Sequence, residues 1–427
     1  MSRIAFTNAR LVDPETGLDQ PGALLVEDGR IADHGPRLFN DAAPSHAEIV
    51  DCGGRVLAPG LIDLKVFTGE PGDEHRETIA SAGRAAASGG VTTICVQPDT
   101  DPPLDDPALI EFVARAPCAV RVLPMGALTQ GLRGEAMSEM GLMAASGAVA
   151  FSDGDKSIAN TRVMRRALSY AATFDFLVAV HAEDPFLAEG GAMNEGETAT
   201  RLGIPGIPAA AEAIIVERDL RLAEITGARL HFAQISTAAA LAAIEAARAR
   251  GVAVTCAVST AHMALNELDV GTYLTFRKLT PPLRSESDRL AMIDGVVSGA
   301  IDAVVSSHDP QAPDTKRLPF AQAAFGGAGL ETLLPVALLP FHNGDASLAA
   351  ALKPVTSAPA RILRLADGSG TLAKGARADL VLFDPGIPRT IRREDLLSRA
   401  KNTPFDGLNF QGAVWRTYAA GLLAHKI

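Results

Sequence analysis

Several ionisable side chains follow short apolar runs of the sequence, where the ends of buried strands could bring them together. His308 and Asp309 follow one such run, and Asp153 follows another. Imidazoles and carboxylates in this position can act as general acids and bases. Together with His231 and His262 they could form a metal-free acid–base set at one end of the fold, although no spacing in the sequence specifies such a set.

A lysine inside an apolar run has other possible roles. Lys65 lies two residues after Asp63, so in a strand the two side chains point to the same side. Its ammonium could be an activated amine, because a buried lysine can titrate at low pH. We favour a structural ion pair, because buried charges are generally paired. We therefore expect Lys65 to be buried, with its ammonium within hydrogen-bonding distance of Asp63, Asp153 or Asp155.

The elements that must position these groups alternate regularly between about residues 56 and 330. Short apolar runs rich in β-branched residues predict eight strands, at 61–67, 91–97, 119–125, 147–152, 176–181, 229–234, 252–258 and 302–307. Ala-rich stretches of helical period predict helices between them, for example at 75–88, 135–146, 158–173, 208–226, 237–250 and 285–299. Eight such units predict an α/β fold, a (β/α)8 TIM-like barrel, in preference to an open sheet.

The two ends of the chain show a different pattern, with alternating apolar and polar residues and turn signals such as Asp28-Gly29 and Asp367-Gly368. We expect residues 1–55 and 365–427 to form a composite small β domain. Residues 56–364 then form the barrel domain.

Composition excludes several classes of partner. The chain of 427 residues has 39 Lys and Arg against 50 Asp and Glu, a formal net charge of −11. This balance argues against nucleic acid and against an anionic membrane surface, since both require a cationic protein face. The first residues lack the apolar stretch of a secretory signal, so we expect a cytoplasmic protein. The cysteines lack CxxC spacing and indicate neither a disulfide framework nor a cysteine zinc site.

Two long stretches closely resemble dihydroorotases of the amidohydrolase superfamily. They are Ala58-Pro-Gly-Leu-Ile-Asp-Leu-Lys-Val-Phe-Thr-Gly-Glu-Pro-Gly72 and Lys401-Asn-Thr-Pro-Phe-Asp-Gly407. Shorter motifs fall between them in the order of the family, at 181–184, 203–208, 234–237, 281–284 and 329–332. The chain is identified as a member of this family on motifs that span nearly its whole length. The resemblance implies a barrel with a composite β domain, in agreement with the pattern of elements.

The resemblance also implies a metal centre that acidifies water, and here most of its ligands are replaced. The family has two histidines in the pattern Asp-x-His-x-His, where this chain has Lys65 and Phe67. An ammonium repels a divalent ion, and a phenyl ring has no lone pair to donate. Of the four remaining ligand positions, His181 keeps its histidine, whereas Gly154, Gln234 and Ser307 replace an aspartate, a histidine and an aspartate of the family. Asp155 could replace the carboxylate lost at Gly154.

Residues that bind the substrate in the family are changed as well. Gly69 stands where the family has an arginine for the substrate carboxylate, and Asp99 and Thr280 replace two asparagines. We therefore interpret Lys65, Phe67, Gly69, Asp99, Gly154, His181, Gln234, Thr280 and Ser307 as a vestigial metal and substrate cleft. We expect no catalytic residue, no bound metal and no cofactor. His181 alone would hold zinc poorly, and a hydrogen-bonded core histidine is the simpler interpretation.

Loss of chemistry from a retained fold implies a structural role. Non-catalytic dihydroorotase-like chains of pyrimidine biosynthesis assemble with aspartate transcarbamoylase, and the resemblance implies that partner here, together with a homo-oligomeric state. The alternative is an active dihydroorotase, or a related cyclic amidohydrolase, with an altered or metal-independent site. The sequence alone does not decide between them, because an interface carries no fixed motif.

Overall fold

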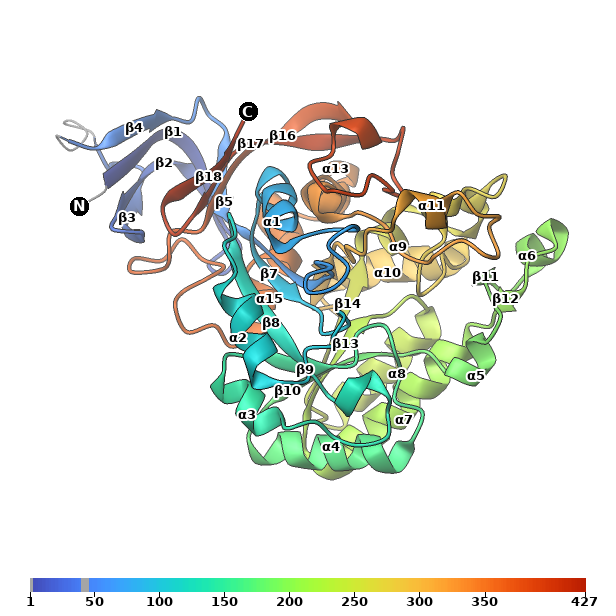
Figure 1. Ribbon diagram of the computed structural model, residues 1–427. Coiled ribbons are helices and arrows are strands. Elements are labelled where there is room, and N and C mark those ends of the chain that lie inside the picture. Colours follow the sequence, from blue (N-terminus) through green and yellow to red (C-terminus); the bar gives the residue numbers. More distant parts are fainter. Residues whose placement is uncertain (1–2, 40–45) are drawn as a thin grey trace.

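The computed structural model describes residues 3–39 and 46–427. It contains two large sheets, one that forms a nearly closed barrel and one that combines both ends of the chain (Figure 1). Within the described residues, no helix is long and apolar enough to cross a membrane.

The barrel is an eight-stranded parallel sheet in the order β15-β14-β13-β10-β9-β8-β7-β6. Its strands are β6 (Leu61–Val66), β7 (Val91–Val96), β8 (Arg121–Ala127), β9 (Ala150–Ser152), β10 (Leu177–His181), β13 (Arg229–Gln234), β14 (Val254–Ser259) and β15 (Ala303–Val305). All six residues of β6 and of β7 are buried, as expected of parallel strands covered on both faces. The predicted α/β barrel is confirmed, and every predicted strand is present within a few residues.

The barrel closes between its first and last strands. Val66 forms an isolated parallel bridge with His308, and the N–H of Phe67 donates to the carbonyl oxygen of His308 over 2.8 Å. The residues that follow β6 and β15 therefore lie side by side at the carboxyl ends of the strands. In barrels of this type, functional groups lie at that end.

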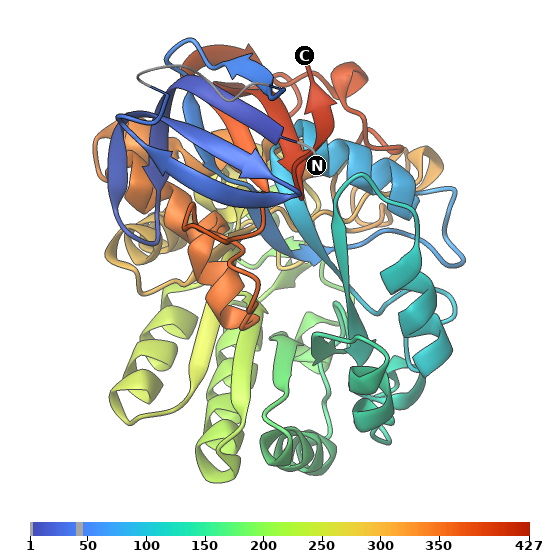
Figure 2. The ribbon, with the colours of Figure 1, turned by 90° about the vertical axis from the view of Figure 1, so that its left-hand side faces the viewer.

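The second sheet has the order β18-β17-β16-β5-β1-β2-β3, with β4 paired to β1. Its strands are β1 (Arg3–Asp13), β2 (Leu18–Glu27), β3 (Arg30–Gly35), β4 (Glu48–Asp51), β5 (Val56–Pro59), β16 (Leu380–Thr390), β17 (Asn409–Ala419) and β18 (Leu422–Lys426). Figure 2 shows the N-terminal and C-terminal strands together above the barrel. The predicted sheet from both termini is confirmed. The chain passes between the sheets after Pro59, four residues beyond the expected boundary, and the division into domains remains a prediction.

Helices surround the barrel, and five of those that cover its strands begin at a capping side chain. Those that cover the strands include α1 (Ile79–Ser88), α2 (Pro107–Arg115), α3 (Met140–Ala145), α4 (Thr161–Thr173), α7 (Ala210–Thr226), α8 (Ala238–Ala249) and α10 (Glu286–Ser298). Shorter helices are α5 (Pro185–Ala188), α6 (Glu197–Leu202), α9 (Thr260–Ala264), α11 (Pro313–Lys316), α12 (Leu333–Ala337), α13 (Leu339–Asn343), α14 (Leu348–Leu352) and α15 (Ser357–Ile362). In α1, Thr78 and Ser81 form a capping box, which fixes the start of the helix just after the first barrel loop. All six predicted helices are present, and α2 was not predicted.

Candidate functional site

The residues predicted to form the cleft gather at the carboxyl ends of the barrel strands, on seven different segments. Four segments contribute to a small cavity, which is lined in part by Asp155, Gln234, Thr280 and Ser307. Its volume is about 20 Å³, whereas small-molecule sites typically measure about 300–1,000 Å³. The cleft is therefore filled by its own side chains.

Lys65 is one of the side chains that fill it. Its side chain is only 5% exposed, and its Nζ donates to Oδ1 of Asp155 over 2.6 Å. Burial lowers the pKa of Lys65, but the carboxylates of Asp155, Asp99 and Asp309 together outweigh it, so that the pKa lies above the usual value. Burial raises the pKa of Asp155, but Lys65, together with His181 and Arg76, outweighs burial, so that this pKa is lowered. The expected ion pair is confirmed, with Asp155 as the partner. Asp63 instead accepts from the backbone N–H groups of Lys65 and Ser306.

Phe67 and Arg76 fill a second part of the cleft. The Phe67 ring is buried, and the Arg76 guanidinium lies 4.1 Å from its centroid, within range of a cation–π interaction. The same guanidinium donates to Oδ1 of Asp309 over 2.6 Å and to Oδ2 of Asp73 over 3.0 Å. A phenyl ring at position 67 thus supports a cation where the family would have a metal ligand.

Asp99 occupies the space beside Gly154. A Cβ added at Gly154 would lie 2.6 Å from Cγ of Asp99, and Gly154 has a φ of +65°, which disfavours other residues. Burial and the nearby carboxylates of Asp155 and Asp309 raise the pKa of Asp99 to about 7. The loss of a ligand at position 154 and the gain of an acid at position 99 therefore fit together sterically.

Gly69 is equally constrained by its backbone. Its φ is +67°, and an added Cβ would lie 2.6 Å from the carbonyl oxygens of both Asp73 and Glu77. Nothing larger than glycine fits this loop as it is folded. The arginine that the family places here would require a different course of the chain.

His181 and Gln234 end neighbouring strands. His181 is 3% exposed. Within the described part of the chain, neither ring nitrogen of His181 has a hydrogen-bond partner, and the nearest carboxylates, Asp155 and Glu183, each lie 3.9 Å away. This differs from the hydrogen-bonded core histidine favoured from the sequence. Gln234 accepts from the Ser307 hydroxyl over 2.9 Å, and its amide nitrogen lies 3.2 Å from Nδ1 of His262. The side chains at two positions that carry metal ligands in the family are therefore hydrogen-bonded to each other.

The possible acid–base set does not assemble. His231 bonds Thr255 inside the barrel, three residues before its strand ends, and burial with Arg248 nearby lowers its pKa to about 3. Asp153 accepts from the backbone N–H groups of Leu128 and Thr129, which commits its carboxylate to the loop.

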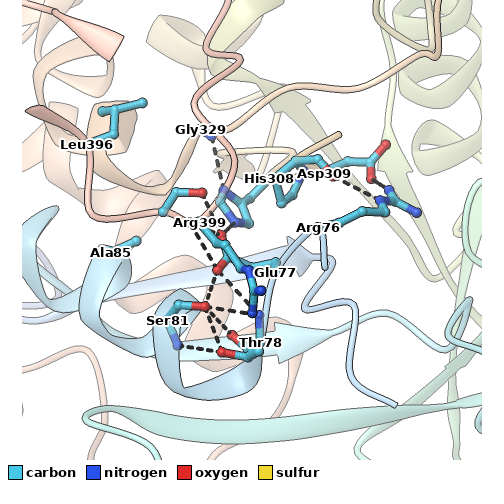
Figure 3. A network of polar contacts seen from close by, with 12 residues as sticks. Arg76, Glu77, Thr78, Ser81, Ala85, His308, Asp309, Gly329, Leu396 and Arg399 are labelled. Atoms are coloured by element: carbon cyan, nitrogen blue, oxygen red, sulfur yellow. Dashed lines mark hydrogen bonds and ion pairs between the residues drawn. The ribbon is translucent and has the colours of Figure 1, made fainter. Parts of the chain in front are cut away.

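His308 is also turned away from the cleft, into the network of Figure 3. Its Nδ1 accepts from the N–H of Gly329, which places the proton on Nε2, 3.5 Å from Oε2 of Glu77. Of the five proposed residues, Asp309 lines the cavity, and His262 contacts two residues that line it, Gln234 and Ser259.

Sequence reasoning missed Arg76. The residue lies in the loop after the first strand, where nothing in its spacing indicates that it folds back on Phe67. Its signal was the unusual Phe67 itself, since a buried ring at the mouth of a polar cleft favours a cation above it.

A divalent metal does not fit the residues present. The ammonium of Lys65 lies within 2.6 Å of the carboxylate best placed to bind one, and Phe67, Gly154 and Ser307 supply no strong ligand. Among residues 3–39 and 46–427, no three His, Cys, Asp or Glu side chains are grouped so that they could hold a metal ion.

The barrel with its composite terminal sheet is a fold shared with solved structures of hydantoinases. The L-hydantoinase (dihydropyrimidinase) from Arthrobacter aurescens superposes with a TM-score of 0.89 at 24% identity, covering 100% of this chain and 96% of its own. A D-hydantoinase gives 0.85 at 20% identity, covering 99% and 95%.

Sequence comparison is more specific. The family model for dihydro-orotase-like proteins matches residues 54–240. The dihydroorotase of Anaplasma phagocytophilum is 42% identical over 99% of this chain and 95% of its own length, and that of Solibacter usitatus is 41% identical over 98% and 97%. The chain belongs to the dihydroorotase family.

Proposed function

We propose that this chain is a catalytically inactive dihydroorotase-family protein of pyrimidine biosynthesis that serves as an assembly partner of aspartate transcarbamoylase. The observation that carries the first half is the filled cleft. Its remaining volume of about 20 Å³ matches roughly one water-sized probe. A ring substrate would have to displace both the Lys65–Asp155 and the Arg76–Asp309 pairs.

The chemistry of the cleft supports the same conclusion. Opening a cyclic amide near neutral pH requires a strong nucleophile, which a metal supplies by acidifying water. Lys65 and Phe67 stand where the first two ligands would be, and Gly69 supplies no cationic fork for a substrate carboxylate.

The partner is proposed from the type of protein that this chain resembles. A fold retained after its chemistry is lost keeps a rigid surface, and binding another protein is the simplest use of such a surface. Holding transferase subunits in a larger complex requires no chemistry in the cleft.

Co-expression with the aspartate transcarbamoylase of the same organism tests this proposal. We expect a stable complex larger than the transferase alone, measured by size-exclusion chromatography with light scattering at low micromolar concentration. We also expect no interconversion of carbamoyl aspartate and dihydroorotate, with or without added divalent metal. Independent elution of a transferase that is fully active alone would refute the partner. Turnover abolished by a chelator would refute the inactivity.

A second candidate is a metal-independent activity on another ring amide, and Asp99 is the observation that favours it. Its pKa of about 7 suits a group that exchanges a proton near neutral pH. This candidate predicts turnover of a cyclic amide that survives a chelator and is lost in Asp99→Asn. Turnover unchanged in Asp99→Asn would exclude Asp99 as the acid.

A further inference from the structure

The cleft contains more negative than positive side chains, and its cations are supplied by the chain itself. Asp99, Asp155 and Asp309 face Lys65 and Arg76. Arg76 pairs with Asp309, and Lys65 pairs with Asp155. Each cation comes from β6 or the loop after it, whereas the carboxylates follow three other strands. The carboxylates of the cleft thus come from several strands around the barrel, and the cations that neutralise them come from β6 and the loop after it.

The surroundings of the Lys65 nitrogen suit an ammonium group. The nitrogen is buried, lies at hydrogen-bonding distance from Asp155, and has Asp99 and Asp309 near enough to raise its pKa further. His181, 97% buried, approaches the same carboxylate to 3.9 Å, and within the described residues its two ring nitrogens have no hydrogen-bond partner. An unpartnered imidazole beside a carboxylate marks a place where a further polar group can bind.

We propose that the cleft is a binding site for a primary ammonium ion, and that in this chain Lys65 itself supplies that ion. The carboxylate of Asp155 is the principal acceptor. Asp309 provides further negative charge, and Asp99 adds to it in its ionised form, since its pKa lies at about 7. The lysine stem acts as a tether that keeps the head group at high effective concentration. This inference deepens the proposed non-catalytic role, because it explains what stabilises the cleft in place of a metal.

The test is to remove the tether and to supply the head group from solution. Lys65→Ala leaves Asp155 unpaired and opens the space of the lysine stem, which is costly in a buried site. We expect the melting temperature at pH 7 to fall by about 5 °C or more. Ethylammonium or propylammonium at tens of millimolar should recover about half of this fall, and both are protonated at pH 7 as lysine is.

Matched probe molecules distinguish the effects of positive charge, of N–H donors and of molecular size. Propanol has the size without the charge, and tetramethylammonium has the charge without an N–H donor, so neither should restore stability. Lys65→Met fills the space with an apolar stem and should not respond to any amine. Equal recovery with propanol or tetramethylammonium would overturn the proposal. So would stabilisation of Lys65→Ala by zinc and not by amines, since the cleft would then be a latent metal site.

A thermodynamic cycle keeps the proposal testable if Lys65→Ala does not fold. Lys65→Met and Asp155→Asn should each lower the melting temperature, and the double variant should fall by less than the sum, because the two groups are in contact. Additive losses would refute the pairing. These readouts are melting temperatures, whereas the proposed function is measured by turnover and by complex formation, so either can fail alone.

Discussion

Glu77 is a buried carboxylate that joins the start of α1 to the C-terminal segment of the chain (Figure 3). It is fully buried and accepts from the hydroxyl groups of Ser81 and Ser398 and from the N–H of Arg399. His308, which lies where the barrel closes between β6 and β15, is 3.5 Å from the same carboxylate. Replacing Glu77 with glutamine keeps the size of the side chain and turns one of its two acceptors into a donor.

The magnitude follows from the contacts that change. Oε1 accepts from Ser81 and, over 3.2 Å, from Arg399, whereas Oε2 accepts from Ser398 over 2.5 Å and from Arg399 over 3.0 Å. Whichever oxygen becomes an NH2 group, one serine hydroxyl loses its acceptor, whereas the N–H of Arg399, which both oxygens share, keeps the other oxygen. Hydrogen bonds to charged groups contribute about 1.5–3 kcal/mol each. We therefore expect Glu77→Gln to lower the free energy of unfolding by about 1.5–3 kcal/mol.

Urea unfolding followed by circular dichroism at pH 7 measures this loss, with the exposed Glu135→Gln as a matched control that should show no measurable change. Burial raises the pKa of Glu77, but His308 and the hydroxyl donors outweigh it, so that the pKa lies below its ordinary value. The contribution of the carboxylate is then complete above the unfolded pKa of about 4.3 and is lost as the pH falls. A loss equal to that of Glu135→Gln, or a difference that grows as the pH falls below 4, would refute this reasoning.

Three further substitutions test the packing of the cleft and its surroundings by the same unfolding assay. Phe67→Ala should lower the free energy of unfolding by about 3–5 kcal/mol and Phe67→Leu by less, because the ring is buried and supports Arg76. An unchanged free energy of unfolding in Phe67→Ala would contradict this packing role. Gly154→Ala should destabilise through its positive φ and through contact with Asp99, and Asp99→Gly, which removes both Cβ and Cγ from that contact, should relieve the second effect, so that additive losses count against the contact. Arg284→Met should cost about 3 kcal/mol, because this buried guanidinium bonds Asn194 and Ser236; wild-type stability would show that those bonds contribute little.

The barrel could be predicted from the sequence because its strands are short, apolar and separated by helices of clear period. The prediction at 91–97 agrees with β7 at Val91–Val96 to within one residue. The helix α2 was missed, since it is only nine residues long and follows a loop rich in Asp and Pro. Closure of the barrel depends on His308 contacting Val66, a pairing distant in sequence that no local pattern specifies.

The loss of the family's metal ligands could be predicted from the sequence, whereas the contacts of the residues that replace them could be predicted only in part. Lys65 at a position that requires a ligand indicated an ion pair, and the structure identifies Asp155 as the partner. The left-handed backbone at Gly69 was not visible, because φ depends on how the loop folds against Asp73 and Glu77. The role of Arg76 could not be read from its position, since it depends on a loop that folds back over Phe67.

The terminal sheet has a consequence for the order in which the chain is completed during translation. β5 emerges early from the ribosome, yet its partner on one side is β16, where Leu57 lies opposite Leu382 and Ala58 opposite Val381. A product released before residue 380 therefore presents β5 with one edge open, and leaves Leu57 without Leu380 and Leu382 of its core cluster. Unpaired edges of this kind are prone to aggregate. Residues 380–383 thus cover an edge of the sheet that residues 56–59 leave open until then.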